Sequence, residues 1–259
     1  MIIQYQIMLF AFALGAVLGS FANVVIHRLP QGWSIVTPGS RCPCCGEPIR
    51  WYDNIPILSY LVLRARCRSC RAPISPLYPA VEALTGLLFA ALVWRVGMQA
   101  AAVPLAVFCW ALVVVTFIDL KHRIIPDVIS LPGTALGIAA AFLPGFPRPV
   151  DSLIGALAGG GFLFLILYAY EKLMNDEWMG MGDVKLMAMI GAFLGWQALP
   201  VTILVASLTG TLTGVAFAVA RGEPVRKFPV PFGPFLALGA VVHIFFGVEI
   251  ILWYLGKLS

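Results

Sequence analysis

The sequence predicts an all-α polytopic membrane protein with about eight transmembrane helices and a small cytoplasmic, zinc-ribbon-like insert. Of its 259 residues, 61% are hydrophobic and only 11% are charged, whereas soluble domains carry about 25% charged residues. A transmembrane helix needs about 20 apolar residues, and eight stretches of the chain approach that length. The only long polar segment lies between the first two stretches and holds five of the six cysteines.

Each apolar stretch is a candidate span. The fourth and sixth are short, so one of them is expected to be partly re-entrant or to cross a thinned bilayer. The first lacks the basic residues that begin a secretory signal, which indicates a retained anchor. The predicted spans are approximately 7–26, 77–96, 101–118, 128–143, 152–170, 184–199, 201–220 and 232–255. The predicted domains are a first helix (1–27), the insert (28–76) and a seven-helix membrane core (77–259).

The basic residues indicate the orientation in the lipid bilayer, because cytoplasmic loops are enriched in lysine and arginine. With the amino terminus outside, three of the 17 basic residues fall on the outer side, namely Arg95, Arg148 and Lys257. The other 14 lie in the inner connections or at their edges. Both termini are therefore predicted to face outward. The net charge of +5 indicates anchoring to the inner leaflet, and no nucleic-acid partner is expected.

Two aspartates at helix ends are the candidate catalytic residues. Asp119 ends the third predicted span and Asp183 begins the sixth, so both fall on the cytoplasmic side at similar depth. A carboxylate at a membrane edge is costly to keep charged, and its presence points to function. Paired carboxylates that share a proton can activate water, as in aspartic proteases. The sequence therefore predicts an intramembrane aspartic protease.

Other polar residues in or near the spans have plainer explanations. Asp127 follows a proline and is expected to cap a helix. Asp176 and Glu177, which precede the Gly-rich turn before Asp183, are the main rivals for the second catalytic position. Glu82, one turn inside the second span, is expected either to pair with an arginine of the insert or to line a cavity.

Small residues at four-residue spacing indicate close helix packing in lipid. The run of three glycines at 159–161 lacks the preceding strand of a nucleotide-binding loop, so packing is the favoured interpretation there too. The spaced pairs are Gly15/Gly19, Gly133/Gly137, Gly155/Gly159, Gly191/Gly195 and Gly210/Gly214.

Four cysteines of the insert form two C-x₂-C pairs, Cys42/Cys45 and Cys67/Cys70. This spacing is typical of structural zinc sites, in which two knuckles hold one tetrahedral ion. A reducing cytoplasm disfavours the alternative of disulfides. Metal binding would also supply the folding free energy of a segment with few aliphatic residues. Cys44 is a spare thiol that could replace Cys45 in a distorted site.

Several ordered motifs resemble those of the type IV prepilin peptidases, which are bacterial inner-membrane aspartyl proteases of the Gly-x-Gly-Asp class. The resemblance covers nearly the whole chain. The matching segments are 19–30, the two cysteine pairs, 54–60, Asp119 with 125–127, 181–186 and 231–235.

The resemblance implies two activities. Such enzymes cleave the short basic leader from prepilins and pseudopilins of type IV pili and type II secretion, at the cytoplasmic membrane boundary. They then methylate the new amino terminus with S-adenosylmethionine. By similarity, Asp119 and Asp183 are the catalytic dyad, and the four paired cysteines hold zinc. The sequence assigns no residues to the methyl donor, since no Gly-rich strand-turn-helix unit is visible.

Two other functions remain open at this point. An ion-coupled transporter would place its acidic residues near the bilayer midplane within an internal repeat, and neither feature is clear. A non-catalytic assembly factor would hold a partner through its zinc insert, and it would tolerate loss of both aspartates.

Overall fold

The computed structural model describes residues 2–174, 180–222 and 230–256, which form helices joined by turns and short loops. They divide into two compact units, 1–114 and 115–259, with the boundary inside helix α4 (Ala102–His122). Asp176 and Glu177, the rivals for the second catalytic position, lie outside the described residues. So do part of the connection between α8 and α9 and the last three residues.

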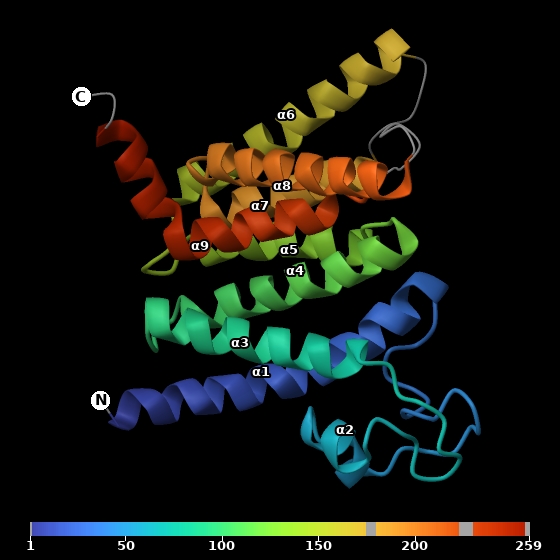
Figure 1. Cartoon of the computed structure of the whole chain (residues 1–259). Helices are drawn as coiled ribbons and strands as arrows, with labels where there is room; N and C mark the ends of the chain where they lie inside the picture. The colour runs from blue at the N-terminus through green and yellow to red at the C-terminus, as the bar shows by residue number, and fades with distance from the viewer. Residues whose placement is uncertain (1, 175–179, 223–229, 257–259) are drawn as a thin grey trace. The chain divides into compact units, whose positions relative to one another are not determined.

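The first unit pairs α1 (Ile2–Arg28) with α3 (Leu77–Val96) and carries the insert between them (Figure 1). The insert contains the 3-10 turns η1 (Leu29–Gln31) and η2 (Trp51–Asn54) and the short helix α2 (Leu58–Val62). The first half of α4 packs on α1, where the Trp110 indole donates to the Leu18 carbonyl at 2.9 Å.

The second unit contains the end of α4 and five further helices, which pack mainly through α7 and its neighbours α5, α6 and α9 (Figure 1). Their bounds are α5 Asp127–Ala140, α6 Pro149–Met174, α7 Met181–Leu194, α8 Ala198–Arg221 and α9 Gly233–Gly256. Leu204, Leu208 and Leu212 expose one apolar stripe of α8. Such a stripe is unfavourable in water and suits a lipid environment.

The helices coincide with all eight predicted apolar stretches, but the prediction of eight spans is not confirmed. Six described helices, α1, α3, α4, α6, α8 and α9, are long and apolar enough to cross a membrane. With 14 residues each, α5 and α7 extend about 21 Å, short of the roughly 30 Å hydrocarbon core. Pro126 precedes α5, and Gly195, with φ of 77°, ends α7. Gly195 therefore stops a helix that hydrophobicity alone would extend.

Several of the spaced glycines lie at close helix contacts. A Cβ at Gly19 would lie 2.7 Å from Cα of Glu82, and one at Gly15 would lie 2.8 Å from the Thr85 carbonyl oxygen, both on α3. In the second unit, Gly155 of α6 and Gly191 of α7 face each other backbone to backbone. Side chains are excluded from these crossings, so the backbones themselves form the contact.

Replacing Gly191 with alanine should therefore destabilise the second unit. Its Cβ would meet the Gly155 carbonyl group and the Ala156 nitrogen, and backbone atoms can yield only if the helices separate. We expect a loss of at least about 2 kcal/mol, at the upper range of overpacking costs. Gly161→Ala in α6 is the matched control, because nothing lies within 4 Å of its added Cβ. Thermal melting of the purified protein should separate the two variants, and equal melting temperatures would contradict this packing.

Candidate functional site

Asp119 lies one turn before the end of α4 and is buried, with 5% of its surface exposed. Its main-chain carbonyl accepts the Arg123 N–H at 2.8 Å, and Arg123 takes a left-handed conformation that ends the helix. Its side-chain Oδ2 accepts the backbone N–H of Gly233 at 3.0 Å. That bond joins residues 114 positions apart and brings the start of α9 to the aspartate.

Asp183 lies in the first turn of α7 and is also buried, with 8% of its surface exposed. Its backbone N–H donates to the Gly180 carbonyl at 3.1 Å, which starts the helix. The side-chain Oδ1 is buried without a hydrogen-bond partner among the described residues. Buried carboxylate oxygens are normally satisfied, so this atom is available to a water molecule or a substrate group.

The two aspartates belong to one site. Asp119 lies close enough to Asp183 for the two carboxyl groups to interact electrostatically. Ile125 lies against both of the neighbouring glycines, because a Cβ at Gly182 would be 2.8 Å from its Cβ and one at Gly233 would be 3.1 Å from its Cδ1. Gly182, next to Asp183, and Gly233, which binds Asp119, therefore share one apolar contact.

The other acidic residues have partners of their own. Asp127, at the first position of α5, accepts hydrogen bonds from Lys185 of α7 at both carboxylate oxygens, each at 2.7 Å, and so forms a surface ion pair. It lies in the first turn of the helix, but the cap position predicted for it is held by Pro126, with no side-chain capping bond. Asp151 of α6 is buried but accepts from Arg148 at 2.8 Å and from the Trp196 indole at 3.1 Å. Neither carboxylate is free for chemistry in the way that Asp183 is.

The four paired cysteines converge in the first unit, as the sequence predicted. All four Sγ atoms of Cys42, Cys45, Cys67 and Cys70 lie within 4.8 Å of one another, and those of Cys42 and Cys70 are 3.8 Å apart. Thiolates at about 2.3 Å from a tetrahedral zinc would be roughly 3.8 Å apart. The cluster therefore fits a four-thiolate metal site.

Two knuckles of the same design hold the cysteines. Residues 41–49 (RCPCCGEPI) and 66–74 (RCRSCRAPI) repeat one pattern, and each closes with an antiparallel bridge, Arg41 to Pro48 and Arg66 to Pro73. In each, the left-handed turn residue, Gly46 or Arg71, donates its N–H to the carbonyl of the first cysteine. This internal repeat was visible in the sequence and strengthens the choice of ligands.

The repeat also resolves the role of Cys44, which is aligned with Ser69 and lies outside the cluster. It is exposed and is not needed as a replacement for Cys45. The backbone N–H groups of Cys45 and Cys44 lower the pKa of the Cys42 thiol to about 6. The thiolate is the form that binds metal, so the knuckle prepares its first ligand. Cys109 is buried in α4 and is a packing residue.

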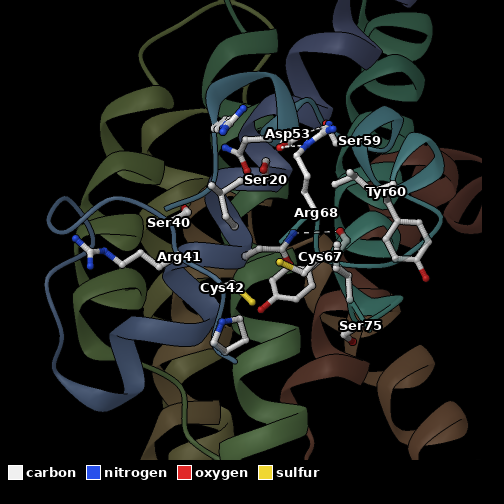
Figure 2. Close-up of a pocket in the computed structure, with 18 of the residues that line it drawn as sticks. Ser20, Ser40, Arg41, Cys42, Asp53, Ser59, Tyr60, Cys67, Arg68 and Ser75 are labelled. Atoms are coloured by element: carbon white, nitrogen blue, oxygen red, sulfur yellow. Dashed lines mark hydrogen bonds and ion pairs between the residues drawn. The ribbon is translucent and has the colours of Figure 1, made fainter. Parts of the chain in front are cut away.

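A cavity of about 540 Å³ lies in the first unit, between the cysteine knuckles and the facing ends of α1 and α3. Figure 2 shows side chains from α1 (Ser20) and from the insert (Arg41, Asp53 and Arg68) around this space. Arg68 binds Asp53 through both carboxylate oxygens, at 2.6 and 2.8 Å, and this pairing lowers the pKa of Asp53. Glu82 reaches the cavity from α3 and accepts the Ile57 N–H at 2.7 Å.

Each of the two units contains residues that match a known protein-family model. Residues 13–96 match the bacterial peptidase A24 N-terminal domain, and residues 106–215 match the type IV leader peptidase family. The chain is 40% identical to a prepilin leader peptidase/N-methyltransferase of Aeromonas hydrophila, over 97% of this chain and 94% of the relative. The chain belongs to the type IV leader peptidase family.

Other members of the family support the same assignment. A prepilin leader peptidase/N-methyltransferase of Pseudomonas aeruginosa is 38% identical over 93% of this chain and 91% of its own length. One of Myxococcus xanthus is 48% identical over 83% of this chain and 64% of its own. No solved structure gave a significant match. The leader-peptidase match spans both aspartates, and the N-terminal match spans the cysteines and the cavity.

Two residues of these sites were not assigned from the sequence. Gly233 donates to Asp119, but only its position in a family motif singled it out, because nothing local predicts a contact across 114 residues. Glu82 was expected either to pair with an arginine of the insert or to line a cavity. It lines the cavity, and its bond to the insert goes to a backbone N–H.

Proposed function

We propose that this protein removes the leader peptide from prepilins and pseudopilins and then methylates the new amino terminus, with Asp119 and Asp183 as the peptidase dyad. The observation that carries the peptidase proposal is the pair itself. Both carboxylates are buried, Asp119 lies within electrostatic range of Asp183, and neither is held in an ion pair among the described residues. The names of the family members supply the substrate and the second activity.

In the proposed mechanism, one carboxyl group of the dyad acts as a general base and the other acts as a general acid. Two neighbouring buried carboxylates do not both ionise cheaply, so the pair carries one proton. The Gly233 N–H stabilises negative charge on Asp119, which supports Asp119 as the base that would take a proton from water. Asp183, with an unpartnered oxygen, would donate its proton to the scissile carbonyl of the leader.

The location follows from the same proposal. Six apolar helices make this a multi-pass membrane protein. A leader peptidase must meet its substrate where the basic leader leaves the membrane, so the proposed position of the dyad is the cytoplasmic face of the bacterial inner membrane. The basic residues of the loops favour the same side.

The insert would hold a structural zinc ion through its four paired cysteines. Four thiolates complete the tetrahedral coordination, so the ion stabilises the fold of 28–76 and offers no open position for chemistry. The dyad is made of second-unit residues and needs no metal.

Gly233 is a positioning residue for Asp119, and Gly233→Ala should separate activity from stability. The new Cβ would lie 2.7 Å from Oδ2 of Asp119. A carboxylate is the movable end of a side chain, so it would turn aside at little cost in stability. A displacement of this size is expected to lower the cleavage rate by at least roughly tenfold.

Gly256→Ala is the control in the same helix, because nothing lies within 4 Å of its added Cβ. Initial cleavage rates and melting temperatures of both purified variants check the prediction. A Gly233→Ala enzyme with the wild-type rate would show that Asp119 does not need this contact.

A further inference from the structure

We infer that the cavity of the first unit is the binding site of the methyl donor, with Glu82 facing a cationic group of S-adenosylmethionine. The inference rests on the proposed methyltransferase activity and gives that activity a location. The cavity volume of about 540 Å³ falls within the range of small-molecule sites, about 300–1,000 Å³. All of its lining residues belong to the first unit, whereas both catalytic aspartates belong to the second.

The decisive feature is the carboxylate of Glu82. The residue is only 8% exposed, lines the cavity and has no cationic partner among the described residues. Its neighbours are the Ile57 N–H, at 2.7 Å, and the Ser20 hydroxyl group. A buried carboxylate is normally paired with a positive charge. A ligand that brings a cation into the cavity would complete this site.

Positively charged side chains also line the cavity, and two of them have no carboxylate partner among the described residues. The Arg28 guanidinium donates only to the backbone carbonyls of Ser34 and Gly39 in the described structure, at 3.1 and 3.4 Å. Arg41, which is exposed, has no carboxylate partner there. In contrast, Asp53 and Arg68 satisfy each other. The cavity thus offers a ligand the buried carboxylate of Glu82 and the guanidinium groups of Arg28 and Arg41, beside the exposed Glu47 and Arg50, which also line it.

The methyl donor matches this arrangement of charges. It carries a sulfonium and an ammonium group that suit Glu82, and a carboxylate that suits an arginine. Its adenine is a flat aromatic group, and Tyr60 and Tyr78 are among the residues that line the same cavity. A simple phosphate or an acidic peptide would leave Glu82 uncompensated.

The walls of the cavity are held in place by the groups that line it. Asn23 of α1 donates to the Tyr78 carbonyl at 3.1 Å, which fixes α1 to the start of α3. Glu82 holds the N–H of Ile57, a β-branched residue with φ of 62°. Such a conformation is costly and persists only when its surroundings hold it. The carboxylate therefore both shapes the insert and faces the cavity.

Glu82→Gln tests the inference in the full-length enzyme. The amide oxygen can still accept the Ile57 N–H, but the negative charge is lost. The affinity for S-adenosylmethionine, measured by calorimetry on the detergent-purified protein, should fall at least roughly thirtyfold, as expected when one partner of a buried charge pair is removed. Glu171→Gln, the same change at an exposed position of α6, should bind the donor as the wild type does.

Ser20→Phe is the second variant and fills the cavity beside Glu82. It should also weaken donor binding, and it decides the test if Glu82→Gln fails to fold by thermal melting. Wild-type affinity in a folded cavity variant would overturn the assignment of the cavity, even if the wild-type enzyme methylates cleaved pilin. A wild-type enzyme that neither binds nor uses the donor would instead overturn the methyltransferase proposal, and the site with it.

Discussion

Replacing Asp119 or Asp183 with asparagine should abolish leader cleavage by the purified enzyme. Neither amide can take up the proton of the attacking water, and the pair works only when both of its members can exchange one proton. General acid–base catalysis contributes roughly a hundredfold to ten-thousandfold, so each variant should lose at least a hundredfold in initial rate. The rate is measured on a synthetic peptide that spans the leader and the first residues of a pilin.

Asp127→Asn is the matched control for these variants. It removes the same negative charge close to the start of α5, but it breaks only the exposed ion pair with Lys185. Surface ion pairs contribute about 0–1 kcal/mol, so the rate and stability of this variant should stay near those of the wild type. If the Asp183→Asn enzyme were as active as the Asp127→Asn enzyme, Asp183 would not be a catalytic residue. Another acidic residue would then have to be the second member of the pair.

Replacing Cys42 or Cys67 with serine should remove bound zinc and unfold the insert. Each knuckle contributes two of the four thiolates, and structural zinc supplies roughly 10–16 kcal/mol of binding free energy to small domains of this kind. Elemental analysis should find about one zinc per wild-type chain and far less in either variant. Hydrogen exchange within 28–76 should rise at the same time.

Cys44→Ser is the control for the cysteine variants, because Cys44 is exposed and lies outside the cluster. It should keep its full zinc content and the protection of the insert. Loss of zinc in Cys44→Ser but not in Cys42→Ser would mean that the first knuckle uses a different pair of thiols from the one that the structure places together.

The helical architecture was accessible from the sequence because lipid imposes one strong rule, a long apolar run for each span. Helix length was harder to predict. Hydrophobicity continues past Gly195, but its backbone at φ of 77° ends α7 there, and α5 ends at Ala140, before the apolar residues Phe142 and Leu143. The count of eight spans is therefore not confirmed at α5 and α7, the two short helices.

Some residues of the candidate sites could be predicted from the sequence, and others could not. The cysteine ligands lie within two short, repeated segments, so local spacing was sufficient to identify them. The contact of Gly233 with Asp119 and that of Glu82 with Ile57 join distant parts of the chain. Such contacts depend on how helices pack, and periodicity carries no information about them. The cavity around Glu82 could likewise be located only once the insert had a structure.

The most direct test of the proposed function and its dyad is the mass of a pilin recovered from cells that co-express its precursor with this protein. With the wild-type enzyme, the pilin should lack its leader and carry one methyl group at its new amino terminus. With Asp119→Asn or Asp183→Asn, it should keep the full mass of the precursor, while Asp127→Asn should match the wild type. Leader-free pilin produced by either dyad variant at the wild-type level would contradict the assignment of Asp119 and Asp183 as the peptidase site.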